Sequence, residues 1–109
     1  MISWNDFAKI EIRTGTILQA IPFTKARKAS YQLQIDFGTL GIKNSSAQIT
    51  HHYSCEELIG KQIIAVVNFP PKQIANFFSE CLVLGVYDDN NEVVLLSPDK
   101  PTNNGQLIG

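Results

Sequence analysis

Residues 31–37 read Tyr31-Gln32-Leu33-Gln34-Ile35-Asp36-Phe37 and carry the clearest structural signal in the chain. Their apolar side chains point one way and their polar side chains the other, which is the period-two alternation of a half-buried β-strand. A helix would instead repeat its apolar residues about every three or four positions. The fold therefore starts from a strand that has one face in a core.

The segments on either side of this strand extend the β pattern. Lys9–Ala20 predicts a long first strand that is interrupted by Gly15, and a glycine inside a strand commonly marks a bulge or a sharp bend. A turn over Gly38–Gly41 leads to a third, more polar strand at Ile42–Ile49. A small barrel needs one strand that bends enough to join both halves of its sheet, and the first strand fits that need.

A short helix and further strands follow. Ser54-Cys55-Glu56-Glu57 is a capping-box pattern, and Gly60 limits the helix that it starts to a turn or two. Ile63–Phe69 is a continuous apolar run rich in β-branched residues, which predicts a strand buried on both faces. Glu80–Tyr87 and Val93–Ser97 predict two more strands joined by a polar turn.

The order of these elements predicts the architecture. Three strands, a short helix and two or more strands make up the all-β, five-stranded Greek-key OB barrel, in which the helix lies between strands three and four. Ser3 followed by Asp6 adds a short N-terminal helical turn, and Leu107-Ile108 can return as a last short strand. The spacing alone also fits another small all-β barrel.

Length and charge narrow the possible functions. A chain of 109 residues is the size of one domain, so residues 1–109 are predicted to be a single domain. The net charge of −1 lacks the overall positive charge of a general nucleic-acid binder. Residues 1–55 hold six basic and three acidic side chains, whereas residues 56–109 hold three and seven. A local basic patch is one interpretation, and an unevenly charged solvated surface is the other.

The composition favours a cytoplasmic protein. No stretch approaches the ~18 apolar residues of a membrane span, so we expect no membrane insertion, and the first residues have no signal-peptide pattern. Cys55 and Cys81 do not make a disulfide framework, which suits free thiols in the cytoplasm.

Metal and catalytic motifs are absent or weak. His51-His52 and Cys55 could be imagined as a zinc site, which needs four ligands or three and an open position, but the other cysteine is distant and no second His pair exists. The chain has no G-x-S-x-G motif, no P-loop and no H-E-x-x-H. We therefore expect a protein that is not an enzyme and that has no metal and no cofactor.

The segment Asn68–Glu80 is unusual because it carries Phe69, Ile74, Phe77 and Phe78 in a predicted loop between strands. Apolar residues in such a loop either tuck under it, form a dimer contact or lie exposed as a patch that binds a partner. Aromatic side chains beside basic groups are also typical of single-stranded nucleic-acid binders.

Four stretches resemble known sequences of the tRNA-binding-domain family. The family pattern N-x-x-P-K/R-x-I/M-x-G-x-x-S-E-x-L/M-x-L is similar to Asn68–Ala75 followed by Ser79–Gly85, and the pattern R-x-G-x-I is similar to Arg13–Ile17. Ala26–Gly38 and Ser45–Thr50 resemble the CsaA branch of this family. The chain departs from the pattern at Asn76, where the family often has glycine, so we expect the loop there to be shaped differently.

This resemblance implies an OB fold, a homodimer and tRNA binding. For the CsaA branch it also implies an export-related chaperone that binds unfolded or precursor polypeptides, and a purely peptide-binding secretion chaperone with no RNA ligand is the alternative. The residues that the family motifs and the basic loop imply as tRNA contacts are Arg13, Arg27, Lys28, Asn68, Lys72, Ser79 and Glu80. The side chains that we expect to bind peptide are Phe69, Ile74, Phe77 and Phe78.

Overall fold

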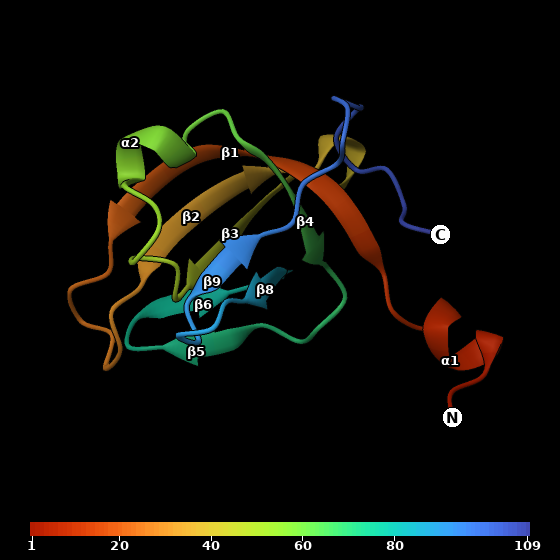
Figure 1. Ribbon diagram of the computed structural model, residues 1–109, viewed down its shortest axis with the longest axis horizontal. Helices are drawn as coiled ribbons and strands as arrows, with labels where there is room; N and C mark the ends of the chain where they lie inside the picture. The colour runs from red at the N-terminus through yellow and green to blue at the C-terminus, as the bar shows by residue number, and fades with distance from the viewer.

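The computed structural model describes residues 1–109, and a curled β-sheet is its main feature (Figure 1). Strand β1 (Ile12–Pro22) lies at the centre of the sheet. It pairs antiparallel with β2 (Tyr31–Asp36) along one edge and with β4 (Gln62–Val66) along the other. The strand predicted at residues 31–37 is confirmed, because its apolar side chains are buried or partly buried towards the core.

The sheet curls until its two outer strands approach each other. β3 (Ile42–Ala47) follows the 3-10 turn η1 (Gly38–Leu40) and pairs with β2, while β7 (Leu82–Val83) pairs with β4. The strand order is therefore β3-β2-β1-β4-β7. The Glu80 N–H, just before β7, donates to the Asn44 carbonyl of β3 at 2.8 Å. The result is a nearly closed five-stranded barrel, which confirms the predicted all-β OB fold.

The bend in β1 is not where the sequence predicted it. Leu18 has no partner in β2, whereas the residues on both sides of it pair in register, so the bulge lies at Leu18. Gly15 has a different role. A Cβ atom at Gly15 would lie 2.7 Å from Ile35 Cγ2 and 2.7 Å from Phe37 Cε1, which is too close for any side chain. The glycine therefore lets β1 pack directly on the core.

The predicted short helix is confirmed as α2 (Cys55–Leu58), between β3 and β4. The Ser54 hydroxyl accepts a hydrogen bond from the Glu57 N–H, and the Glu57 carboxylate accepts one from the Ser54 N–H. This capping box satisfies two backbone donors at the helix start. Leu58 is fully buried in the main apolar cluster, so the helix covers part of the core.

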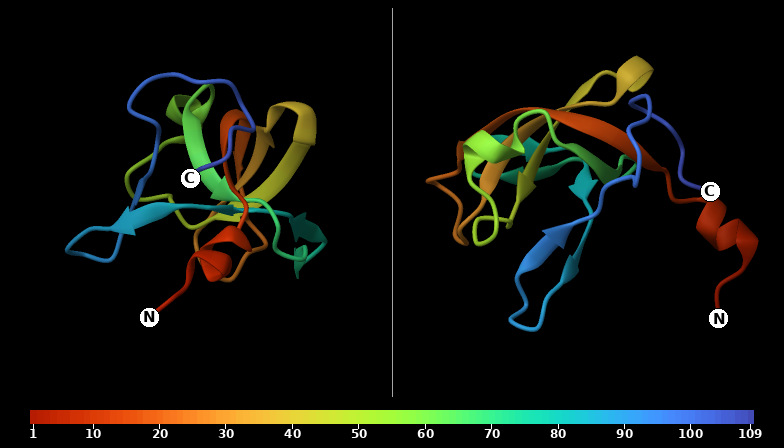
Figure 2. Two further views of the ribbon diagram at one scale, coloured as in Figure 1. Left: turned by 90° about the vertical axis from the view of Figure 1, so that its right-hand side faces the viewer. Right: turned by 45° about the horizontal axis from the view of Figure 1, so that its top comes forward.

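The N-terminal helix α1 (Trp4–Ala8) lies away from the barrel (Figures 1 and 2). Ser3 and Asp6 form its predicted capping box. Lys9 caps the C-terminal end of the helix, and β1 therefore begins at Ile12 rather than at Lys9. No residue of α1 is buried within this chain. None of the helices is long and apolar enough to cross a membrane.

The interpretation of residues 68–80 as a loop was wrong in part. Within it, β5 (Lys72–Ile74) and β6 (Phe77–Ser79) form an antiparallel hairpin. Strands of three residues are too short to show a clear alternation in sequence. The turn between them places Ala75 at a φ of 54°, in the left-handed region that favours glycine.

The single strand predicted over Glu80–Tyr87 divides at Leu84. The first part is β7, and the second is β8 (Gly85–Tyr87), which pairs with β9 (Val93–Leu95) in a separate hairpin. The Leu84 N–H donates to β4 at 2.8 Å, while its carbonyl accepts from Leu96 at 3.1 Å. Leu84 thus makes backbone hydrogen bonds to two different sheets. The β8–β9 hairpin projects from the barrel (Figure 2).

The C-terminal tail returns along β1. The last strand predicted at Leu107-Ile108 is reduced to one β-bridge, between Leu107 and Arg13. The Ile108 N–H donates to the Ile12 carbonyl at 2.8 Å, and the Gly105 N–H donates to the Thr14 carbonyl at 2.7 Å. The tail therefore lies along the start of β1 as an irregular strap.

Candidate functional site

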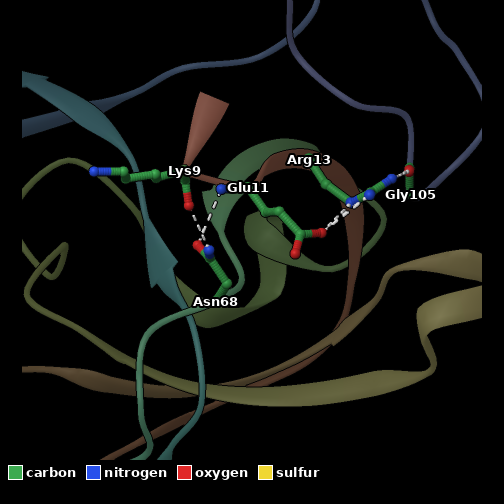
Figure 3. A network of polar contacts seen from close by, with 5 residues as sticks. All are labelled: Lys9, Glu11, Arg13, Asn68 and Gly105. Atoms are coloured by element: carbon green, nitrogen blue, oxygen red, sulfur yellow. Dashed lines mark hydrogen bonds and ion pairs between the residues drawn. The ribbon is translucent and has the colours of Figure 1, made fainter. Parts of the chain in front are cut away.

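Arg13 lies at the start of β1 with its guanidinium group engaged inside the molecule (Figure 3). One amino group, Nη1, donates to the Gly105 carbonyl at 2.8 Å. The other, Nη2, donates to the Glu11 carboxylate at 3.0 Å, and Nε does so at 3.3 Å. Arg13 therefore ties the C-terminal tail to β1, and its predicted tRNA contact stays a prediction.

Asn68 follows β4 and uses both ends of its side-chain amide (Figure 3). Its Oδ1 accepts from the Glu11 N–H at 3.0 Å, and its Nδ2 donates to the Lys9 carbonyl at 2.8 Å. These two bonds hold the connection between α1 and β1 against the end of β4. The amide has an architectural role, and its contact with tRNA is likewise untested.

Ser79 and Glu80 close one end of the seam between β3 and β7. The Ser79 hydroxyl accepts from the Ser46 N–H at 3.0 Å, and the Glu80 carboxylate accepts from the Asn44 N–H at 2.9 Å. The buried Ser45 hydroxyl donates to the carbonyl of Cys81, the residue after Glu80, at 3.0 Å. Side chains thus supply here the hydrogen bonds that a backbone ladder makes elsewhere.

A hollow of about 380 Å³ lies beside this seam. It brings together four of the predicted residues, namely Phe69, Lys72, Ile74 and Ser79. The sequence reasoning missed the other five lining residues, which are Ser46, Gln48, Pro70, Cys81 and Leu82. Two signals in the sequence pointed to Ser46 and Gln48, namely the polar character of the third strand and the resemblance of Ser45–Thr50 to the CsaA branch.

A second hollow, of about 450 Å³, adjoins the first. The two share Ser46, Gln48 and Leu82, so they form one continuous depression, which we call the groove. Lys28 lines its far end, together with the β8–β9 hairpin residues Tyr87, Asn91, Glu92 and Val93. Arg27 is exposed on the same loop as Lys28, but it does not line the groove.

Phe77 and Phe78 are adjacent in sequence but make different contacts. The Phe77 ring packs edge-on against Phe23, with centroids 5.3 Å apart, and so joins the β5–β6 hairpin to the basic loop after β1. Phe78 is 52% exposed, and both phenylalanines line a hollow outside the groove, together with Asn76 and Glu80. Of the four predicted peptide-binding residues, the groove contains only Phe69 and Ile74.

The charges of the groove are largely free. The ion pairs of the structure involve Lys9, Arg13 and His52, and none of these residues lines the groove. Lys72 and Lys28 therefore present uncompensated ammonium groups, one in each hollow. Glu92 is the one acidic residue on its walls.

The thiols and imidazoles are placed for structure. Burial raises the pKa of Cys81 to about 11, and burial followed by the nearby Glu56 raises the pKa of Cys55, so neither thiolate is favoured at neutral pH. His52 Nε2 lies 2.7 Å from Asp88 Oδ2 and links the segment before α2 to the β8–β9 hairpin. No group of three or more His, Cys, Asp and Glu side chains is placed to hold a metal ion.

The chain matches a known protein family over residues 12–107, and that family is described as "Putative tRNA binding domain". A curated relative, the methionine–tRNA ligase of Methanococcoides burtonii, is 34% identical over 108 residues, which is 99% of this chain and 16% of the ligase. The chain thus spans about a sixth of the length of the curated relatives that it matches.

Two solved structures are similar over their full length. The chaperone CsaA of Bacillus anthracis is 50% identical with a TM-score of 0.94, and the alignment covers 100% of this chain and 99% of that one. The CsaA chaperone protein of Picrophilus torridus is 55% identical with a TM-score of 0.93, and both chains are covered completely. Agreement at this level means that the barrel, both hairpins and the tail belong to a shared architecture.

Proposed function

The chain belongs to the tRNA-binding domain family, and from this membership we propose that it binds tRNA in the groove. The observation that carries the proposal is the pair of free lysines, Lys28 and Lys72, one in each hollow. Such ammonium groups bind backbone phosphates, and the exposed Arg27 adds a third cation beside Lys28. OB folds bind nucleic acid with the loop after the first barrel strand and with the connection between the fourth and fifth barrel strands, which are β4 and β7 here. The first of these segments carries Arg27 and Lys28, and the second carries Lys72.

Aromatic side chains in the groove suit unpaired bases. Phe69 is 54% exposed in the first hollow, and Tyr87 is 76% exposed in the second. Proteins that recognise RNA loops and ends stack the splayed bases on such rings. We therefore propose a single-stranded part of tRNA as the element that is bound, rather than a duplex.

We further propose that the protein binds without catalysing a reaction, that the 109 residues act as one domain, and that the site of action is the cytoplasm. The two free cysteines, Cys55 and Cys81, support this location. The depressed tendency of both cysteines to ionise supports a binding role, because a catalytic thiol needs the opposite shift.

Fluorescence anisotropy with labelled tRNA at several salt concentrations tests the tRNA proposal. We expect binding at low salt whose logarithmic affinity falls linearly with the logarithm of the salt concentration, because counterions are released from the phosphates. An absence of binding at low salt would contradict the proposal. A measurable affinity that does not depend on salt would contradict the role of the lysines.

Polypeptide binding is a second candidate function, and the apolar walls of the groove favour it. Phe69, Ile74 and Leu82 line one hollow, which suits an apolar segment of a polypeptide. The similarity to two CsaA chaperones supports a chaperone that acts on unfolded or precursor polypeptides during export. A secretion chaperone with no RNA ligand is the remaining alternative. The tRNA titration distinguishes the two, because this alternative predicts no binding of tRNA even at low salt.

Suppression of client aggregation tests this candidate. Phe69 and Phe78 are matched probes, because they are 54% and 52% exposed and lie inside and outside the groove. We expect Phe69→Ser to reduce suppression strongly and Phe78→Ser to leave it nearly unchanged. Equal effects of the two substitutions would assign polypeptide binding to a different surface.

We also propose that the protein is a homodimer. Two projecting elements carry apolar side chains that this chain does not cover, namely Trp4 of α1 and the cross-strand pair Val86 and Val94 of the β8–β9 hairpin. Such patches mark protein–protein contacts more often than free surface. Light scattering should give twice the mass of one chain, and a monomer at micromolar concentration would overturn the proposal.

A further inference from the structure

The outer edge of β3 is paired at one end only. Asn44 directs its N–H and its carbonyl to Glu80, and Ser46 directs its N–H to the Ser79 hydroxyl. In an antiparallel ladder, alternate residues face alternate edges, so these two residues face away from β2. The same alternation places the backbone of Gln48 on that outer edge.

Beyond Ser46 this edge has no partner. The ladder between β2 and β3 ends at the pair Tyr31 and Ala47, yet buried and exposed side chains continue to alternate through Gln48 to Ile49. The side-chain pattern of the strand therefore continues past the end of its ladder. The Gln48 N–H has no hydrogen-bond acceptor in the rest of the protein, and no β-ladder pairs the Ser46 carbonyl on this edge.

The groove runs along this unpaired edge. Ser46 and Gln48 line both of its hollows, and the second hollow is also lined by the inward-facing Ala47 and Ile49. A hollow that touches residues from both faces of a strand lies at the edge of that strand rather than over one face. The free main-chain groups are thus open to whatever occupies the groove.

We propose that an extended polypeptide segment binds as an added β-strand along this edge, donating to the Ser46 carbonyl and accepting from the Gln48 N–H. The inference rests on the polypeptide-binding function proposed above and names its mode of recognition. The two free groups belong to residues two apart, and one edge of an extended polypeptide offers its own N–H and carbonyl with the same repeat.

The charges of the groove also select the segment. The walls of the groove carry two positive charges, from Lys28 and Lys72, and one negative charge, from Glu92. This net positive charge favours a segment with neutral or acidic side chains. Recognition through the backbone makes affinity depend weakly on sequence, while Ile74 and Leu82 give a modest preference for apolar side chains. That combination suits a protein that binds many unfolded clients.

Amide hydrogen exchange on the full chain tests the proposal. The probe is a synthetic octapeptide of alternating valine and threonine with one glutamate, titrated to saturation. We expect exchange of the Gln48 amide to slow at least about tenfold, as for an N–H that gains a hydrogen bond. Gln48→Pro, which removes the N–H, should weaken peptide binding about tenfold, while the matched variant Gln48→Ala, which keeps it, should bind within about threefold of the wild type.

The outcomes separate this inference from the function on which it rests. Peptide binding with unchanged Gln48 exchange in the wild-type protein overturns strand addition and leaves polypeptide binding standing. Absence of peptide binding overturns both. Protection of Gln48 by an oligoribonucleotide but not by the peptide assigns the edge to RNA and also overturns the proposal. Because the exchange measurement uses the wild-type chain, it does not depend on the folding of Gln48→Pro.

Discussion

The predicted site residues divide into two regions with opposite roles. The pinned region contains Arg13, Asn68, Ser79 and Glu80, whose polar groups are engaged in internal hydrogen bonds. The free region is the groove with Lys28, Lys72 and Phe69, whose polar or aromatic groups meet solvent. Family motifs thus mix residues that build the barrel with residues that are available to a ligand. Changes in the pinned region should alter stability, whereas changes in the free region should alter binding.

The largest expected effect is a pH dependence of stability at Cys81, which follows Ser79 and Glu80 of the pinned region and also lines the first hollow of the groove. Burial raises the pKa of Cys81 from 9.0 to about 11, so the folded state holds the thiol proton more tightly than the unfolded state. The resulting stability is fully present below pH 9 and falls as the pH rises towards 11, by about 3 kcal/mol in total. Urea denaturation at pH 8 and pH 10.5 should show this loss in the wild type and much less of it in Cys81→Ala. The same loss in both proteins would contradict the assignment.

The next effect comes from the side chain that closes the seam. Glu80→Ala removes the acceptor of the Asn44 N–H and should lower the free energy of unfolding by about 1.5 kcal/mol. Glu80→Gln keeps an oxygen at this position and should recover most of the loss. Urea denaturation of the two variants gives the comparison, and an equal stability of both would show that the hydrogen bond contributes little.

In the free region, the double substitution Lys28→Ala and Lys72→Ala should weaken tRNA binding about tenfold at low salt and reduce the salt slope by about 2. Stability should not change, because neither lysine forms an ion pair. Lys100→Ala is a matched control, since Lys100 is exposed in the C-terminal tail and lies outside the groove. If Lys100→Ala weakened tRNA binding as much as the double substitution, the groove would not be the tRNA-binding site.

The smallest effect tests whether the Asn68 side chain stabilises the fold or contacts tRNA. Asn68→Ala deletes two hydrogen bonds that are partly solvent-accessible, so unfolding should become easier by about 1 kcal/mol. The affinity for tRNA, measured well below the unfolding midpoint, should stay within about twofold of the wild type. A much larger loss of affinity at unchanged stability would move Asn68 from the pinned region to the free one.

Much of the fold was predictable because its signals are local. The alternation at residues 31–37 and the capping boxes at Ser3 and Ser54 each need only a few neighbouring residues, and all of them are confirmed. The β5–β6 hairpin was missed because strands of three residues carry too little pattern. The division of the strand at Leu84 was missed because it depends on partners from two different sheets.

The candidate site was predictable only as a set of residue types. Sequence motifs grouped Phe77 with Phe78 and Arg13 with Lys72, but adjacency along a chain does not say which face or which end of the barrel a side chain reaches. Alternation places the two phenylalanines on opposite faces of β6, so one packs on Phe23 and the other meets solvent.

The sequence by itself determined the β class, the order of strands and helix, the family and the cations that a ligand can meet. Only the tertiary structure decided which polar groups remain free, because hydrogen-bond partners come from segments far apart in the chain. Arg13 bonds to Gly105, and Asn44 bonds to Glu80. The groove lies where those long-range partners end, along Ser46 and Gln48, and no local pattern in the sequence shows that the backbone is unpaired at that point.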